Sequence, residues 1–362
     1  MPYSRVAMPF LIKKFSDCRL DDPFFDSLKE DYDEFDIWFK KKSKSGETAY
    51  VHDDENGMIQ AFLYIKDVDC ETVGDLIEEP RIKMGTLKIN PASEGQRLGE
   101  GAIGIALWKW QKSDLDQIYV TVFPKHKVLI DLLEKYGFEE YGKKGEECVF
   151  AKDKRKMRYD TIHRSFPYFN PNLSRGKYIP IHDEFHDSMF QYSELKNTMQ
   201  NVGDLSVSNG ITKNFIATPS SNIDYRPGDI VFIYRMHQGP GLKGCKSVVT
   251  SYCIVSKIEW FKKGGKNISN YDDYLKFVGN KSVYTSEVLK KEYEKKNLCV
   301  IELLYSGYFG AGHNITHNSL KEAGLFEKHP YEIKLNREEI NKIMRMGGKD
   351  EQDIIVDQSR TH

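Results

Sequence analysis

The chain has 362 residues, of which 40% are apolar and 12% aromatic, so it can bury substantial cores and form about two domains. Its formal net charge is −1, which excludes a strongly basic or acidic protein. The charge is nevertheless uneven, because residues 1–156 hold 25 basic against 30 acidic residues, a net of −5, whereas residues 157–362 hold 28 against 24, a net of +4. The second half can therefore bind nucleic acid if its basic residues cluster, since a local stripe matters more than a sum.

The cysteine spacing and the first residues predict a cytoplasmic protein. The six cysteines are scattered without a C-x-x-C pair, so the sequence indicates neither a zinc site nor a disulfide framework, and reduced thiols are typical of the cytoplasm. The chain begins with Pro and Arg inside a short apolar run and has no small-residue cleavage site, unlike a signal peptide. No apolar stretch approaches the roughly 20 residues that cross a bilayer. We therefore expect no membrane partner, and the oligomeric state stays open.

The first part of the chain predicts strands around an aromatic helical region. Val6–Ile12 reads as a first strand, and residues 24–39 carry aromatics at helical spacing that we interpret as core. Two further strands, Ala49–His52 and Met58–Ile65, are joined by a turn whose Asn-Gly pair favours positive φ. Arg81–Asn90 is the next strand, and a proline stops it.

A glycine-rich turn then leads into a helix. From Gln96 to Ala102 the sequence stops alternating, and the apolar residues that follow are dense enough for a helix buried against a sheet. Gly99 and Gly101 lack a Cβ atom, so a ligand can approach the backbone where the first N–H groups of the helix have no intrahelical partner. Such a helix start binds anions, although a short glycine pattern also occurs in connections that bind nothing.

After this helix, Gln117–Phe123 reads as a strand, Val128–Tyr136 as a helix and Glu147–Lys152 as a closing strand. The predicted order of the first domain is therefore β-α-β-β-β-α-β-α-β.

Two motifs resemble the GNAT superfamily of acetyl-CoA-dependent N-acetyltransferases. Gln96, Gly99 and Gly101 match the family signature R/Q-x-x-G-x-G/A. Gly137-Phe138, which ends the second predicted helix, resembles the "GF" that precedes the last strands of the family.

The chain departs from the family pattern at two positions of that second helix. Counting back from Gly137 places His126 where the family often has an asparagine that touches the pantetheine arm. The same count places Leu133 where the family often has the tyrosine that protonates the departing thiolate. The resemblance therefore supports the fold and the cofactor better than it supports a particular proton donor.

The resemblance implies a mixed-sheet GNAT fold over residues 1–152, with acetyl-CoA as cofactor and the aromatic helices covering one lip of an acceptor site. The strand before the glycine turn is expected to offer backbone groups to the pantetheine amides, and the turn to hold the phosphates. The residues expected to contact acetyl-CoA are Leu87, Lys88, Ile89, Gln96, Arg97, Leu98, Gly99, Glu100, Gly101, Ala102 and His126.

Acetyl transfer to an amine also needs an acceptor nitrogen without its proton, a donor for the developing oxyanion and a proton for the thiolate. Backbone N–H near Ile89 can stabilise the oxyanion. Asn90 and Tyr136 are the candidate catalytic side chains, although Asn90 is not an obvious base and Tyr136 lies nearly one helical turn past the missing tyrosine, where a core role is the alternative. Glu94 or Glu100 acting through water is a further possibility.

A charge run, KDKRKMR, follows the first domain and predicts a solvated connection. We place a linker at residues 153–182, a second domain at residues 183–346 and a disordered polar tail at residues 347–362. A helix is expected from Asp183 to about Gln200.

His182 and His186 are spaced so that two imidazoles could share one helical face, as in some metal sites. No third ligand is apparent nearby, and Pro180 suggests that His182 precedes the helix. We therefore expect no metal.

The second domain reads as strands at Lys213–Ala217, Tyr225–Arg235, Ser247–Ile258 and Leu298–Tyr305, with helices that include Val283–Lys296 and Asn336–Met346. A strand entered through a Pro-Gly-Asp turn and leaving with Tyr-Arg resembles the PUA-like group of small β-barrels, which includes the ASCH and EVE domains. The resemblance covers about residues 210–345. It implies a PUA-like β-barrel with flanking helices after the GNAT fold, an α+β protein as a whole, and binding of RNA or modified bases.

An aromatic and basic face would suit that role, because rings stack on bases and cations hold phosphates. The alternative is that the same aromatics fill the barrel interior. The candidate nucleic-acid-binding residues are Tyr234, Arg235, Tyr252, Lys257 and Trp260.

The sequence thus predicts a cytoplasmic N-acetyltransferase whose second domain presents an amine acceptor, RNA or a nucleobase. One alternative is a nucleic-acid-binding or regulatory module whose GNAT domain binds coenzyme A without catalysis. Another is a protein-amine or aminoacyl-tRNA acetyltransferase, including a toxin. The sequence does not rank these acceptors.

Overall fold

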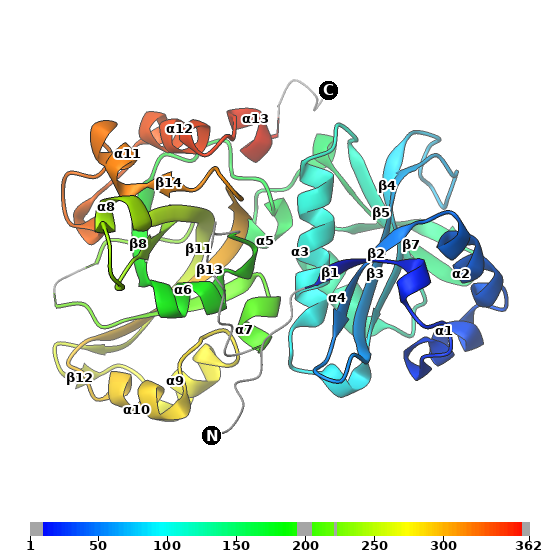
Figure 1. Cartoon of the computed structure of the whole chain (residues 1–362), viewed down its shortest axis with the longest axis horizontal. Helices are drawn as coiled ribbons and strands as arrows, with labels where there is room; N and C mark the ends of the chain where they lie inside the picture. Colours follow the sequence, from blue (N-terminus) through cyan, green and yellow to red (C-terminus); the bar gives the residue numbers. More distant parts are fainter. Residues whose placement is uncertain (1–9, 194–204, 221–222, 357–362) are drawn as a thin grey trace. The chain divides into compact units, whose positions relative to one another are not determined.

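The chain divides after Lys156 into two units, Met1–Lys156 and Met157–His362 (Figure 1). A computed structural model describes residues 10–193, 205–220 and 223–356. Each unit combines helices with a mixed sheet of seven strands, which confirms the α+β class. None of the helices in these ranges has the length and apolar character that a bilayer crossing requires.

The sheet of the first unit has the order β1-β2-β3-β4-β5-β7-β6 and is antiparallel except where β4 and β5 run parallel. Residues Val6 to Pro9 of the predicted first strand lie outside the described residues. The strand that sequence analysis missed, β6, is polar and mostly exposed, so it lacks the apolar alternation that marks a strand. The strands are β1 Leu11–Lys14, β2 Thr48–Asp53, β3 Ile59–Asp69, β4 Arg81–Ile89, β5 Gln117–Val122, β6 Glu139–Lys144 and β7 Glu147–Asp153.

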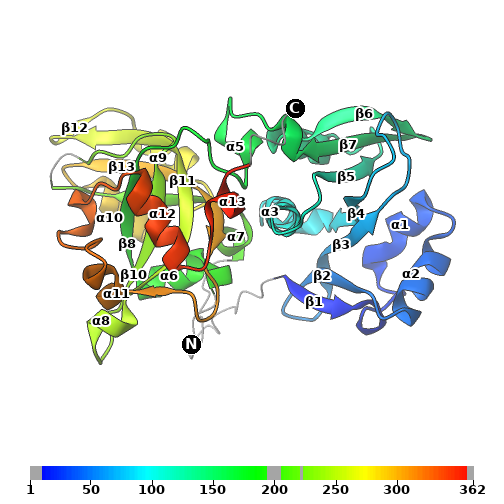
Figure 2. The same cartoon turned by 90° about the horizontal axis from the view of Figure 1, so that it is seen from above.

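Helices cover both faces of this sheet. Figure 2 shows α3 (Leu98–Gln111) on one side and α1 (Asp26–Asp31) with α2 (Phe35–Lys44) on the other. α4 (Lys127–Lys135) packs beside α3.

Most of the aromatic stripe of the α1/α2 face is core, as the spacing predicted, whereas Tyr32 is exposed and Trp38 is partly buried. Phe62 and Tyr64 of β3 pack against Phe15 with ring centroids 5.4 and 5.3 Å apart. Phe25 and Phe39 are buried in the same cluster. Edge-to-face rings at these distances add to the stabilisation that their buried area supplies.

A fully buried arginine holds the segment between β3 and β4. Arg81 donates from Nε to Gln117 Oε1 at 3.2 Å and from Nη1 to the Glu71 carbonyl at 2.9 Å. Its Nη2 donates to the Ile77 carbonyl. Three acceptors thus satisfy a guanidinium that has no exposed surface.

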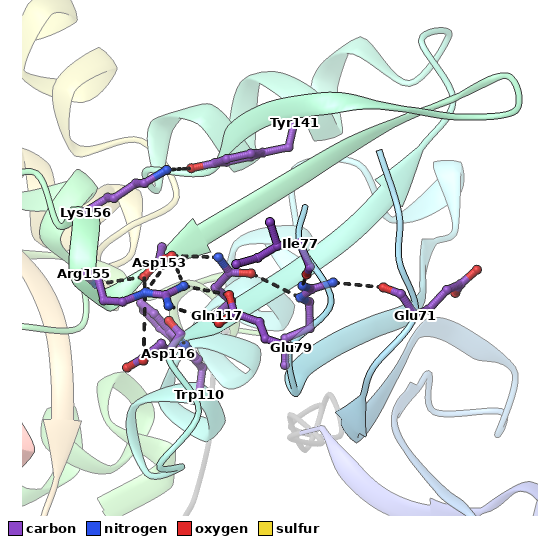
Figure 3. A network of polar contacts seen from close by, with 11 residues as sticks. Glu71, Ile77, Glu79, Trp110, Asp116, Gln117, Tyr141, Asp153, Arg155 and Lys156 are labelled. Atoms are coloured by element: carbon purple, nitrogen blue, oxygen red, sulfur yellow. Dashed lines mark hydrogen bonds and ion pairs between the residues drawn. The ribbon is translucent and has the colours of Figure 1, made fainter. Parts of the chain in front are cut away.

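The network continues to the end of the unit (Figure 3). Gln117 donates to Asp153 at 2.7 Å, and Arg155 spans Asp153 at 2.7 Å and Glu79 at 2.7 Å. Burial opposes the charge on Asp153, yet hydrogen bonds from Arg155 and Gln117 lower the pKa of its carboxyl. The segment Glu71–Glu79 is therefore tied at both ends to β4, β5 and β7.

Lys152 of β7 is almost completely buried, and its Nζ donates to the Tyr136 carbonyl at 2.6 Å. Burial lowers the pKa of this ammonium well below its ordinary value. Between the lowered pKa and the unfolded value of about 10.5, the unfolded chain therefore binds more protons than the folded chain. In that window the free energy of unfolding rises with pH, and it falls as the solution is acidified.

Replacing Lys152 tests the predicted direction in which the free energy of unfolding changes with pH. Lys152→Met removes this titrating group, so the free energy of unfolding of the variant no longer falls with acidification through this group. Relative to wild type it should increase by up to about 1.4 kcal/mol for each unit by which the pH is lowered within the window. The Tyr136 carbonyl loses its donor at every pH, a constant cost of about 1 kcal/mol. Urea unfolding between pH 6 and 10 measures both, with Lys143→Met on exposed β6 as control. Parallel pH curves for Lys152→Met and wild type would contradict a buried titrating amine.

The sheet of the second unit has the order β8-β10-β11-β13-β9, and β12 and β14 pair with β11. β8 runs parallel to β10, and the other pairs are antiparallel. In the part of the chain that the structure describes, no pairing joins β8 to β9, so the expected barrel is not confirmed. The strands are β8 Gly176–His182, β9 Thr212–Ala217, β10 Ile230–Met236, β11 Val248–Lys263, β12 Lys266–Asn267, β13 Leu298–Tyr308 and β14 Ile315–Thr316.

Two helical groups pack on this sheet (Figure 1). Residues of α9 and α10 share one core cluster with β9, β11 and β13, while residues of α11, α12 and α13 share another with β10 and β11. The helix predicted to reach Gln200 ends at Met189, and the residues from Glu194 lie outside the described ranges. The helices are α5 Ile162–Ser165, α6 Asp183–Met189, α7 Leu205–Asn209, α8 Lys243–Lys246, α9 Tyr271–Val278, α10 Ser286–Tyr293, α11 His317–Glu322, α12 Arg337–Met346 and α13 Glu351–Ile354.

The structure corrects two predicted boundaries. The expected linker at residues 153–182 begins with the end of β7 and closes with β8, whose Tyr178 and Ile179 have no exposed surface. Prolines and asparagines around this strand masked its signal. The expected tail at residues 347–362 is ordered to Val356, because Ile354 packs into the core. Residues 357–362 of that tail lie outside the described ranges.

Candidate functional site

The two parallel strands of the first sheet part halfway along their length. β4 and β5 pair only from Ile82 with Ile118 to Met84 with Val120. Beyond these residues β4 continues beside β3 to Ile89, and β5 continues beside β7 to Val122. The facing backbone edges of β4 and β5 there do not pair with each other, and a ligand with amide groups can pair with them; we call this opening in the ladder the passage.

Helix α3 begins beside this passage. Arg97, its N-cap residue, has φ of 57°, and its own side chain makes no capping hydrogen bond to the helix. The first turn of an α-helix carries N–H groups that the helix cannot satisfy and the positive end of the helix dipole. This geometry suits a phosphate.

Gly99 lies where this helix start, β4 and α4 meet. A Cβ atom at Gly99 would lie 3.5 Å from Leu132 Cδ2 and 3.9 Å from Ile89 Cγ1. The missing side chain thus leaves room directly over the first turn of α3. The residues predicted to contact acetyl-CoA at the end of β4 and in the glycine turn are brought together here, and they fit a ligand with phosphates and amides.

Two of the predicted contact residues have side-chain neighbours on α1 or at its end. The Lys88 side chain lies on the α1/α2 face, where Nζ donates to Ser27 Oγ at 2.5 Å and sits 5.1 Å from the Phe24 ring. Only the backbone of Lys88 borders the passage. His126 is the N-cap residue of α4, and its Nε2 lies 4.0 Å from an Asp31 carboxylate oxygen.

The candidate catalytic tyrosine is engaged by a carboxylate. Tyr136 has no exposed surface, and its hydroxyl donates to Glu100 Oε1 at 2.9 Å. Glu100 also pairs with Arg97 at 2.5 Å. The three side chains brace the end of α4 against the start of α3, which favours a core role for Tyr136.

The second catalytic candidate caps a short helix. The Asn90 side chain accepts from the Ala92 N–H at 3.1 Å. It lies at the end of β4 and is partly exposed, so it borders the passage. Leu133, at the position where the family often has a tyrosine, is fully buried.

A cavity of about 310 Å³ lies on the α1/α2 face beside Gly85, at the point where β4 leaves β5. The ladder between β3 and β4 breaks register there, and a Cβ atom at Gly85 would lie 2.7 Å from the Tyr64 ring. Only glycine fits such a close approach. The cavity is lined by Trp38, Lys41, Lys42, Tyr64, Lys66, Asp69, Glu71, Lys83 and Gly85.

Sequence analysis missed the polar residues of this cavity. Asp69 accepts from Lys66 at 2.6 Å and from the Tyr119 hydroxyl, and Glu71 accepts from Lys83 at 3.0 Å. Asp69 ends β3 and pairs with Arg81 of β4, and Glu71 follows two residues later. The ladder between β3 and β4 shifts register twice, and such shifts have no signature in the residue pattern.

The five candidate nucleic-acid residues of the second unit do not form one exposed face. Tyr234, Arg235 and Tyr252 are buried, and Arg235 pairs with Asp187 at 2.9 Å. Lys257 and Trp260 keep exposed surface. Tyr234 and Tyr252 therefore fit the alternative that these aromatics fill the interior of the domain, since a buried ring cannot stack on a base. Arg235 is buried with them.

The histidines considered for a metal have other partners. His186 is fully buried between Asp187 at 2.8 Å and Thr250 at 2.7 Å. Burial is the main cause of its lowered pKa. His182 precedes α6, as its neighbouring proline predicted.

The second unit has a larger cavity, of about 830 Å³, between the two edge strands of its sheet. It is lined by Lys177 of β8 and by Asn214 of β9, and the partly exposed rings of Tyr284 and Tyr331 face it. A concave, partly aromatic site of this volume is typical of a small-molecule or base-sized ligand.

No family model matches the chain, and no curated protein does. Among solved structures, a GNAT-family acetyltransferase from Listeria monocytogenes matches at 16% identity over 40% of this chain and 94% of that chain, with a TM-score of 0.31. A phosphinothricin acetyltransferase from Sinorhizobium meliloti, solved with AcCoA, matches at 14% identity over 40% of this chain and 89% of that chain, with a TM-score of 0.30.

An ASCH protein from Zymomonas mobilis matches at 12% identity over 47% of this chain and 95% of that chain, with a TM-score of 0.30. Scores and identities this low establish no family membership. The functional argument therefore rests on strand order, the passage between β4 and β5, and the start of α3.

Proposed function

We propose that the first unit is a GNAT-type N-acetyltransferase that uses acetyl-CoA, and that the second unit is a PUA-like domain that presents an amine on RNA or a nucleobase. One observation carries the proposal. The parallel strands β4 and β5 part before helix α3, whose first turn contains Gly99.

Each part of this arrangement has a chemical role in the proposal. The N–H groups at the start of α3 hold phosphates, and the free edges of β4 and β5 orient the amides of the pantetheine arm. Bound acetyl-CoA supplies an acyl group activated as a thioester. Backbone N–H near Ile89 stabilises the charge that develops on the acyl oxygen, and the passage admits the acceptor from the face that carries α1 and α2.

Isothermal titration calorimetry of the full chain with acetyl-CoA tests the cofactor, and we expect saturable binding. Thioester consumption is then followed with total cellular RNA and, separately, with total protein. Turnover with RNA supports the acceptor proposed here, whereas turnover with protein alone moves the acceptor to a protein amine. Absence of acetyl-CoA binding removes the enzyme proposal altogether.

A second candidate function is a regulatory module that binds coenzyme A without catalysis. Buried Leu133 favours it, because an aliphatic side chain cannot supply a proton to a thiolate. The same thioester assay separates the two functions, since any turnover rejects the binding-only alternative.

RNA binding by the second unit is expected to weaken as salt rises, because phosphate contacts release counterions. Lys257 and Trp260 are the predicted contact residues that keep exposed surface, and the cavity between β8 and β9 is a further candidate.

Tyr136→Phe separates positioning from proton donation. The ring stays in the core, but the charged Glu100 carboxylate loses the hydrogen bond that the Tyr136 hydroxyl donates to it. A hydrogen bond to a charged group is worth about 1.5–3 kcal/mol of stability. Because Glu100 lies in the first turn of α3, we expect a weaker affinity for acetyl-CoA with little change in kcat. A fall in kcat at unchanged acetyl-CoA affinity would instead identify Tyr136 as the proton donor. Calorimetry and initial rates measure the two quantities.

A further inference from the structure

We infer that the acceptor is an uncharged amine attached to a nucleotide, and that the cavity beside Gly85 receives it. This inference rests on the proposed acetyltransferase function and adds the class of acceptor. The cavity lies on the α1/α2 face, opposite α3, and touches β4 where the passage between β4 and β5 opens.

The charge of the cavity selects against cationic amines. Its lining includes four lysines and two carboxylates, and Glu47, which pairs with Lys42 at 3.2 Å, adds a third carboxylate. The excess is therefore one positive charge, although residues 1–156 as a whole have a net charge of −5. An ammonium acceptor, such as a polyamine or a lysine side chain, is repelled there, and a phosphate is attracted.

None of these carboxylates is placed to remove a proton from an ammonium, and Glu47 is already held by Lys42 and the Tyr64 hydroxyl at 3.2 Å each. Glu71 lies between Lys144 and Lys83, whose hydrogen bonds lower its pKa. Burial opposes the charge on Asp69, yet hydrogen bonds from Lys66 and Tyr119 lower its pKa. Carboxylates held in this way are weak bases.

The acceptor must therefore arrive largely unprotonated. An α-amino group, with a pKa of about 7.7–8.0, is partly free base near neutral pH, whereas a lysine amine, with a pKa of about 10.4, is not. Exocyclic amines of nucleobases carry no proton to remove beforehand.

The aromatic side of the cavity suits a base. Trp38 is partly exposed and stands at 76° to Tyr64, which is buried behind it with ring centroids 5.7 Å apart. Lys42 braces Tyr64 through a hydrogen bond of 2.6 Å. One accessible ring, Trp38, next to lysines is a combination that can hold a base and its phosphate together.

The transfer balances without a further reactant. The amine nitrogen forms a bond to the acetyl carbon, and the carbon–sulfur bond of the thioester breaks. The nitrogen releases one proton, and the departing thiolate takes up one proton to become free coenzyme A.

Calorimetric titration of the full chain, saturated with coenzyme A, tests the acceptor class. AMP and a ten-nucleotide single-stranded RNA are the anionic probes, and spermidine and a lysine-containing peptide are the cationic ones. We expect both anionic probes to bind and neither cationic probe to do so. Binding of RNA without AMP assigns the site to a nucleic acid chain rather than a free nucleotide, and both results support the inference.

Matched variants on one helix show where the probes bind. Lys41 lines the cavity, whereas Lys44, also on α2, does not. Lys41→Glu should weaken AMP and RNA binding at least tenfold, and Lys44→Glu, with the same change of charge, should not. Lys66→Gln, at a half-exposed side chain, should weaken binding without harming the fold.

Equal effects of Lys41→Glu and Lys44→Glu, or tight binding of spermidine, would overturn the inference. A chain that binds coenzyme A but no anionic probe rejects the acceptor class alone. A chain that binds no coenzyme A rejects the acetyltransferase, so the two failures are distinguishable.

Discussion

Gly99→Glu is expected to weaken acetyl-CoA binding by the full chain about 100-fold or more. The new carboxylate would occupy the space between Leu132 and Ile89, over the first turn of α3. Two like charges about 4 Å apart at an effective dielectric of 20 repel by about 4 kcal/mol, and each 1.4 kcal/mol is a factor of ten in Kd. The fold should survive, because an acidic residue in the first turn of a helix is favourable.

Gly99→Ala is the matched control. Its Cβ would make ordinary contacts at 3.5 and 3.9 Å, so it should bind acetyl-CoA nearly as wild type does. Calorimetry gives both affinities, and circular dichroism checks that each variant is folded. Wild-type affinity in a folded Gly99→Glu variant would place the ligand away from α3.

Arg81→Met should destabilise the first unit by about 3–5 kcal/mol. The substitution leaves the acceptors on Gln117, Glu71 and Ile77 without a donor whose own side chain has no exposed surface. A hydrogen bond to a charged group contributes about 1.5–3 kcal/mol, and the two that are only part-buried contribute less than the buried one to Gln117.

Urea unfolding followed by tryptophan fluorescence measures this loss, because three of the four tryptophans lie in the first unit. Lys109→Met is the control, because its ion pair with Asp67, 2.7 Å long, is partly exposed and worth at most about 1 kcal/mol. An unchanged midpoint for Arg81→Met would show that the network carries no net stability.

The periodic and turn-bounded parts of the fold were predictable from the sequence. Gly99 and Gly101 mark the start of α3 because a helix-period run of apolar residues follows them directly. The strand Arg81–Asn90 was placed to within one residue, because its proline ends the ladder.

Features set by distant contacts were not predictable. Arg81 reads as a polar strand start, and only the fold brings Gln117 beside it. From the sequence, Tyr252 could equally be a base-stacking ring or an interior one, and only the fold shows that it packs against Phe309 with ring centroids 5.5 Å apart. Strand β8 was missed because Pro180 lies within it, at an edge where a proline costs no ladder hydrogen bond.

The parting of β4 and β5 has a thermodynamic consequence for the first unit. It creates two strand edges inside a sheet, where edges normally occur only at the rim. A ligand whose amides pair with these edges acts as an additional short strand and belongs to the folded state only. By mass action, ligand at 100 times Kd then raises the free energy of unfolding of this unit by about 2.7 kcal/mol. Its unfolding temperature therefore increases with ligand concentration. In the proposed acetyltransferase, the resistance of the first unit to unfolding would thereby be coupled to the supply of its acyl donor.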